Sequence, residues 1–266
     1  MKFQDVFLVS DLDGTLIGEN HTIPQRNIDA IRRFQEQGGR FAIATGRSID
    51  SGARYYRRVF PKGLCVMLNG SILYDCELDH IAAVFSLPPE AKEYARRLAE
   101  HFPEMGYEVF TQREQYVVKE NQLVNEHMEH ENLPCTPVED DSITEPWCKV
   151  LFAAEPDVKQ RMHAFTETFA HPGVRFVQSD ARFLEMLPEG VDKGSALEEI
   201  LRQTGLKREK LIAIGDYYND IEMLKTAGFA VVPSNAPEEL QQMADLVVGD
   251  CRFGAVADLI EYLERA

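Results

Sequence analysis

The sequence predicts an α/β protein with a doubly wound parallel sheet, into which a second α+β unit is inserted. Short apolar runs alternate with helical patterns at both ends of the chain, and several of these runs end in polar turns. Such alternation favours parallel strands joined by right-handed crossovers. The alternation is lost in the middle of the chain. We therefore expect a Rossmann-like core over residues 1–84 and 185–266, with an inserted cap over residues 85–184.

The first part of the core is predicted to begin with a buried strand. Phe7–Ser10 is a short apolar run that stops at Asp11, as expected for a strand covered on both faces. Thr22 is predicted to cap the following helix, with Gln25 reaching back toward it, and Gly38 ends that helix. Further parallel strands are predicted at Arg40–Ala44 and Leu64–Leu68.

The inserted unit has partial strand alternation without turn signals at strand ends, which favours an antiparallel sheet. Its helices are predicted at 88–101 and 156–169. Its strands are predicted at Tyr107–Thr111, Tyr116–Lys119, Lys149–Ala153 and Val174–Gln178. The core then resumes, with strands at Leu211–Ile214 and Phe229–Val232 and helices at Gly194–Thr204, Asp220–Ala227 and Ala255–Arg265.

Composition excludes several classes of partner. The net charge is −16, from 28 basic and 44 acidic residues, so the surface repels nucleic acid and anionic lipid. An anionic substrate would need local cations at its site. No stretch approaches the roughly 18 apolar residues needed to span a membrane. The five cysteines include no C-x-x-C pair, which favours reduced thiols in a cytoplasmic protein. The oligomeric state stays open.

Asp11-Leu12-Asp13-Gly14-Thr15 follows the first predicted strand, at the edge where open parallel sheets bind ligands. Extended-chain alternation would point Asp11 and Asp13 the same way. Two adjacent buried carboxylates need neutralisation, either by a hard cation with oxygen ligands or by a proton on one of them. The alternative interpretation is a simple strand-ending turn, since Asp and Gly favour turns.

Three other segments place phosphate-binding or acidic groups at the same predicted edge. Thr45-Gly46-Arg47 supplies a hydroxyl, an unhindered backbone N–H and a cation, all suited to phosphate oxygens. Lys193-Gly194 opens a helix, where the ammonium and the helix N-terminus can act on one anion. Gly215-Asp216 and Asp220 form a second acidic cluster. Together these groups predict a site for a metal and a phosphate.

These residues resemble the haloacid dehalogenase superfamily, and specifically its Cof-type sugar-phosphatase branch. The resemblance covers the whole chain, including a large cap between the second and third motifs. The matching segments, in order, are Asp11-Leu12-Asp13-Gly14-Thr15, Ala44-Thr45-Gly46-Arg47, Asp192-Lys193-Gly194 and Gly215-Asp216-Tyr217-Tyr218-Asn219-Asp220, with Asn69-Gly70 and Asn235-Ala236 also fitting the branch.

The resemblance implies a Mg²⁺-dependent phosphatase that acts through an aspartyl-phosphate. Asp11 would be the nucleophile and a metal ligand. Asp13 would be the general acid and base, with its backbone carbonyl also on the metal. Thr45 and Lys193 would hold the transferring phosphoryl group. Asp216 would complete the metal ligands.

The remaining assignments concern the rim of the site. Asp220 is counted with the metal site and would orient the cluster from close by, whereas Gly46, Arg47, Asn69 and Asn219 would face the substrate. The expected substrate is a small phosphorylated metabolite such as a sugar phosphate. A phosphomutase of the same superfamily and a non-catalytic metabolite-binding protein stay open as alternatives.

Tyr217 and Tyr218 lie inside the last motif. We expect them to pack against the protein, with contact to the substrate as the alternative.

Overall fold

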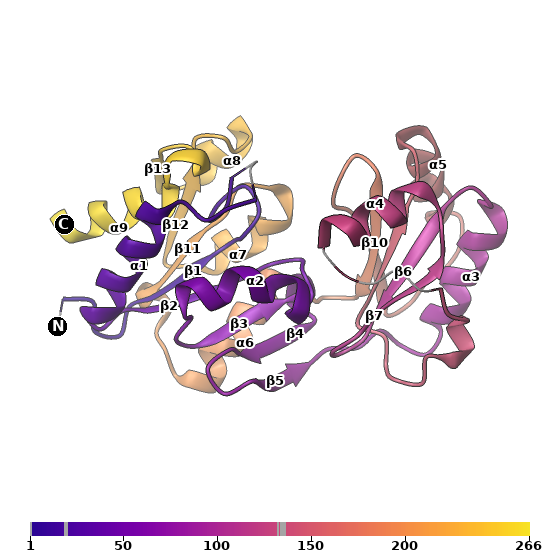
Figure 1. Cartoon of the computed structure of the whole chain (residues 1–266), viewed down its shortest axis with the longest axis horizontal. Coiled ribbons are helices and arrows are strands. Elements are labelled where there is room, and N and C mark those ends of the chain that lie inside the picture. The colour runs from indigo at the N-terminus through magenta and orange to yellow at the C-terminus, as the bar shows by residue number, and fades with distance from the viewer. Residues whose placement is uncertain (1, 19–20, 132, 134–136) are drawn as a thin grey trace. The chain divides into compact units, whose positions relative to one another are not determined.

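The computed structural model describes residues 2–18, 21–131, 133 and 137–266, and it divides into two compact units (Figure 1). The first unit comprises the residues up to Arg47, Gly52–Ala83 and Asp192–Ala266; the second comprises Ser48–Ser51 and Val84–Val191. The predicted α/β class with an additional α+β unit is confirmed. Cys135 lies outside the described residues.

The first unit is built on a five-stranded sheet in which every pairing is parallel. Its strand order is β13-β12-β11-β1-β2. The strands are β1 (Phe7–Ser10), β2 (Arg40–Ile43), β11 (Leu211–Ile214), β12 (Phe229–Pro233) and β13 (Leu246–Val248). Ser10 ends β1 opposite Ile43 and Ile214. Because parallel strands end at one edge, the residues that follow β1, β2 and β11 are brought together there.

Helices cover both faces of this sheet. The connections β1 to β2 and β11 to β12 run in opposite directions across it, so right-handed crossovers place α1 and α7 on opposite faces. Helix α9 packs against α1, and α6 packs against α7 (Figure 1). The helices are α1 (Gln25–Glu36), α2 (Ile49–Val59), α6 (Lys193–Thr204), α7 (Ile221–Thr226), α8 (Glu238–Met243) and α9 (Ala255–Arg265).

The predicted cap of the first helix is wrong. Helix α1 begins at Gln25, its N-cap position is Pro24, and no side-chain hydrogen bond caps it. A proline disfavours helical geometry in the residue before it, so Ile23 cannot belong to the helix and Thr22 stands too far away to cap it.

The third strand also differs from the prediction. Strand β3 (Leu64–Met67) contacts the parallel sheet through a single bridge, Ala44 to Val66. It pairs antiparallel with β4 (Ile72–Asp75), and β5 (His80–Val84) completes a separate three-stranded sheet. The chain reverses at Asn69 (φ 53°) and Gly70 (φ 110°), so β3 is followed by a tight turn into an antiparallel partner.

The second unit contains an antiparallel five-stranded sheet in the order β7-β6-β8-β10-β9. Helices α3 and α5 contribute to the apolar core against one face of it. The elements are α3 (Ala91–His101), β6 (Gly106–Phe110), β7 (Gln115–Lys119), α4 (Gln122–Glu131), β8 (Lys149–Ala153), α5 (Pro156–Thr166), β9 (Val174–Gln178) and β10 (Phe183–Pro188). The expected return to the core near residue 185 falls inside β10, and the first unit resumes at Asp192.

Buried charged residues also occur on this second sheet. Glu108 is fully buried, and both of its carboxylate oxygens lie close to His127 Nδ1, at 2.9 and 3.0 Å. Lys149 Nζ lies 3.4 Å from Glu185 Oε1, and both of these residues are buried. Burial favours the neutral imidazole, but the Glu108 carboxylate outweighs it and raises the pKa of His127 above its ordinary value.

Among the described residues, no helix is both long enough and apolar enough to cross a membrane.

Asn27 fastens α1 to two distant segments, and its loss should destabilise the first unit. Its buried side chain donates from Nδ2 to the Leu16 carbonyl (3.0 Å) and accepts at Oδ1 from the Ala257 N–H (2.9 Å). Asn27→Ala removes the partner of both buried groups, so we expect the free energy of unfolding to fall by about 2 kcal/mol or more in urea denaturation. The control Gln25→Ala, on the exposed side of α1, should change it by less than about 0.5 kcal/mol. Equal losses in the two variants would contradict this role.

The His127–Glu108 pair predicts a pH-dependent contribution to stability. A raised folded-state pKa means that the contribution is fully present below the unfolded pKa of about 6.5 and is lost as pH rises through the folded value. His127→Gln should therefore destabilise the protein more near pH 5.5 than near about pH 9, as measured by thermal or urea unfolding. The control is His80→Gln, at an exposed position on β5, which should show no such difference. A larger loss at the higher pH would contradict the pairing.

Candidate active site

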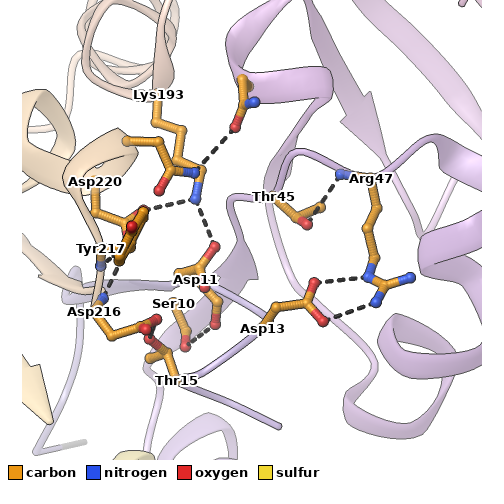
Figure 2. Close-up of polar contacts among 12 residues, drawn as sticks. Ser10, Asp11, Asp13, Thr15, Thr45, Arg47, Lys193, Asp216, Tyr217 and Asp220 are labelled. Carbon is orange, nitrogen blue, oxygen red and sulfur yellow. Dashed lines mark hydrogen bonds and ion pairs between the residues drawn. The ribbon is translucent and has the colours of Figure 1, made fainter. Parts of the chain in front are cut away.

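A buried lysine stands at the carboxyl edge of the parallel sheet. Lys193 is the first residue of α6, and Asp192 caps that helix by accepting the Ser195 N–H. The Lys193 Nζ lies 2.5 Å from Asp11 Oδ1 and 2.6 Å from Asp220 Oδ1 (Figure 2). Asp11 directly follows β1, the strand between β2 and β11. The ammonium therefore joins the end of β1 to the segment that follows β11.

Three carboxylates gather around this lysine. Oxygens of Asp11, Asp216 and Asp220 lie within 4.8 Å of one another. Thr15 Oγ1 donates to Asp216 Oδ1 at 2.7 Å. Asp220 accepts the backbone N–H groups of Asp216 and Tyr217 at Oδ2, while its Oδ1 contacts Lys193. Both oxygens of Asp220 thus have protein partners, which fits a residue that positions the cluster.

The protonation of this cluster reflects its excess of negative charge. Burial raises the pKa of Asp11 well above its ordinary value, against the attraction of Lys193. Burial and the neighbouring Asp220 raise the pKa of Asp216 to about 7. Burial alone would lower the pKa of Lys193, but the carboxylates of Asp11 and Asp220 raise it, so the ammonium stays charged. One ammonium against three clustered carboxylates, two of them buried, leaves a donor set that fits a hard divalent cation.

Asp13 faces a different partner from Asp11. Arg47 binds both of its carboxylate oxygens, through Nε at 2.7 Å and Nη2 at 2.8 Å (Figure 2). The guanidinium of Arg47 is buried and lies 5.2 Å from the centroid of the Tyr55 ring. The alternation expected for Asp11 and Asp13 does not hold, because β1 ends at Ser10 and Asp13 lies beyond it, in an isolated bridge with Ile17.

The other residues expected at the substrate side also lie close together. The Thr45 carbonyl accepts the Asn69 N–H at 3.0 Å, and Asn69 Oδ1 accepts from Asn219 Nδ2 at 3.3 Å. A Cβ at Gly46 would stand 3.0 Å from Asn69 Nδ2, so this position has little room for a side chain. Thr45 Oγ1 accepts the Arg47 N–H at 3.2 Å. The segments after β2, β3 and β11 are thereby linked.

Two residues support the site in ways that sequence reasoning did not foresee. Thr15 holds Asp216 through its hydroxyl, a role that its place in the first motif did not indicate. Asn235 donates from Nδ2 to the Gly14 carbonyl (2.9 Å) and accepts the Cys251 N–H at Oδ1 (2.9 Å). In the sequence, the only indication for Asn235 is that Asn235-Ala236 fits the family branch. It ties the segment after β12 to the turn after β1.

The haloacid dehalogenase-like hydrolase family matches residues 8–260 of the chain. The chain belongs to this family. A putative phosphatase of Haemophilus influenzae is 27% identical over 262 residues, covering 98% of each chain. The HMP-PP phosphatase of Serratia proteamaculans is 26% identical, covering 96% of this chain and 94% of the relative. The crystal structure of a haloacid dehalogenase-like hydrolase from Bacteroides thetaiotaomicron is 27% identical, with a TM-score of 0.88 and coverage of 97% and 99%.

The predicted family is thus confirmed, and this hydrolase is a phosphatase. Its acidic cluster of Asp11, Asp216 and Asp220 offers oxygen ligands for a divalent metal.

Gly14 should be essential to the position of Asp216. Its φ is +81°, and a Cβ there would lie 2.3 Å from Asp216 Oδ2. Gly14→Ala should therefore displace this carboxylate and weaken the binding of a divalent metal at the cluster at least about tenfold, as measured by isothermal titration calorimetry with Mg²⁺ as the titrant. Gly205→Ala is the control, because Gly205 also has a positive φ (+67°) but a Cβ there meets nothing within 4 Å. Unchanged metal affinity in Gly14→Ala would contradict this placement.

Proposed function

We propose that this phosphatase hydrolyses small phosphorylated metabolites with Mg²⁺, through an aspartyl-phosphate on Asp11. The proposal rests above all on buried Asp11 directly after β1, paired with Lys193 and adjacent to Asp216. A carboxylate is repelled by a phosphate dianion, so its attack on phosphorus needs local positive charge. Lys193 supplies one such charge from within the protein.

In the first displacement, an oxygen of Asp11 bonds to phosphorus while the bond from phosphorus to the leaving alcohol oxygen breaks. Asp13 gives that oxygen its proton. In the second displacement, Asp13 takes a proton from a water molecule as the water oxygen bonds to phosphorus. The bond between phosphorus and the Asp11 oxygen breaks, and inorganic phosphate is released. The Asp13 side chain is 46% exposed, so both the alcohol and water can reach it.

Other side chains orient these groups. Thr45 and Lys193 hold the phosphoryl oxygens, and Asp220 fixes Lys193 together with the backbone that carries Asp216. Asp11, Asp216 and the backbone carbonyl of Asp13 would hold Mg²⁺, a set with few carboxylates that suits this ion. When bound, Mg²⁺ supplies positive charge that offsets the charge on the phosphoryl oxygens.

The inserted unit is proposed to select the substrate, since the residues assigned to the chemistry lie outside residues 85–184. A small metabolite is favoured because the net charge of −16 opposes nucleic acid and anionic membranes. The HMP-PP phosphatase relative also acts on a phosphorylated compound. A reducing, cytoplasmic setting fits the reduced thiols of Cys65, Cys76, Cys148 and Cys251.

Metal removal tests the proposed cofactor. Excess EDTA should abolish phosphate release from a panel of phosphorylated metabolites, Mg²⁺ should restore it, and Ca²⁺ should restore it poorly because Ca²⁺ is larger and less strict in geometry. Full activity in excess chelator would exclude the proposed cofactor. Substrate conversion without phosphate release would favour the phosphomutase alternative, and binding without turnover would favour a metabolite-binding protein.

Asp13→Asn tests the two-step chemistry. A sugar alkoxide needs a proton as it leaves, whereas nitrophenolate does not, so this variant should lose sugar-phosphate turnover but still react with nitrophenyl phosphate. The second step then lacks its base, and the phosphoryl-enzyme should accumulate. Rapid-quench measurements should show a burst of nitrophenol approaching one equivalent per active site.

The controls separate this role from general damage. Asp11→Asn should show neither a burst nor turnover, whereas Asp29→Asn, an exposed change on α1, should behave as the wild type. If Asp13→Asn slows both substrates equally and traps no phosphoryl-enzyme, direct attack by water becomes the better mechanism.

A further inference from the structure

Two neighbouring tyrosines stand exposed beside the acidic cluster. Tyr217 and Tyr218 are 43% and 49% exposed, so neither is packed into the interior as the sequence analysis expected. Their ring centroids lie 5.0 Å apart with an interplanar angle of 69°. They directly follow Asp216 and precede Asn219, in the segment after β11. Tyrosines are enriched at binding interfaces, so an exposed pair within a site loop is a candidate for contact with the substrate.

The backbone around this pair is held on both sides. The Tyr217 N–H donates to Asp220 Oδ2 at 3.1 Å, and its carbonyl accepts the Asp220 N–H at 2.9 Å (Figure 2). On the other side, Asn219 bonds Asn69 through its side chain. Asp220 is fully buried, so the segment is anchored to the interior while both rings face outward. The backbone that carries the two rings is therefore held directly after Asp216, next to the proposed phosphoryl site.

The rest of this edge is polar and charged. Lys193, Thr45 and the carboxylates suit a phosphoryl group, which every phosphate monoester shares, so they cannot discriminate between alcohols. One tyrosine ring meets the other edge to face, so the pair can offer both a π face and a ring edge to a ligand. A flat aromatic ring in the substrate gains favourable contact with both. A saturated ring of equal size has no π system and gains less.

We propose that Tyr217 and Tyr218 bind the alcohol part of the substrate and select phosphate monoesters that carry a flat aromatic or heteroaromatic ring. This inference rests on the phosphatase function proposed above. It names two specificity-determining residues within the first unit and a class of substrate.

Benzyl phosphate and cyclohexylmethyl phosphate test the proposal, since both release a primary alcohol of similar size and only one ring is flat. The wild type should show a kcat/KM at least about fivefold higher for benzyl phosphate. Tyr217→Leu and Tyr218→Leu should each lower this ratio, and the double variant should bring it close to one. The variants Tyr217→Phe and Tyr218→Phe keep the rings and should retain the higher kcat/KM for benzyl phosphate. They keep the proposal testable if a leucine variant fails to fold.

Tyr262→Leu is the matched control. Tyr262 lies on α9, is 45% exposed and stacks on Phe229 of β12. Its loss should leave the ratio of kcat/KM between the two esters unchanged. Equal kcat/KM for both esters in the wild type, or a ratio that survives the double variant, would overturn the proposal. A clear preference for glucose 6-phosphate over benzyl phosphate would also overturn it. If no phosphate monoester is hydrolysed at all, the proposed function itself fails, which is a distinguishable result.

Discussion

The buried ammonium of Lys193 is the interaction on which the site depends. It joins Asp11 to Asp220, residues that lie 182 and 27 positions away from it in the sequence. A buried charge is costly unless it is paired and hydrogen-bonded, and here two carboxylates satisfy it. Removing either carboxylate would unbalance the other charges. The lysine therefore both holds the chain segments together and supplies positive charge where a phosphoryl group would bind.

Close backbone approach lets these segments meet. A Cβ at Gly215 would stand 2.6 Å from Asp220 Cγ, and one at Gly70 would stand 2.3 Å from the Asp192 carbonyl oxygen. Each contact joins a turn at the carboxyl edge to a residue that orients Lys193 or caps its helix. The precision of the site thus comes from tightly packed turns as much as from the charged side chains.

The edge of the sheet has two chemically distinct parts. Asp11, Lys193 and Asp220 are buried and bonded to one another, which fits a rigid site for a group common to all substrates. Asp13 and the tyrosine pair are partly exposed, and they would meet the part of the substrate that varies. Catalysis and substrate recognition can therefore share one edge, because the segments that carry both sets of residues follow the strand ends.

By itself the sequence determined the strands β1, β2 and β11 and the family motifs that follow them, because apolar periodicity and turn residues are local signals. Convergence of Asp11 and Asp216 at one edge also followed, since parallel strands end together, and Lys193 was placed there as the start of a helix that leads into β11. The tertiary structure alone decided that Arg47 holds Asp13, that Asn219 bonds Asn69 and that Tyr217 and Tyr218 stay exposed. It also decided that β3 turns into an antiparallel sheet and that β10 belongs to the second unit. These features depend on which turns meet in space, and no local pattern in the chain encodes that meeting.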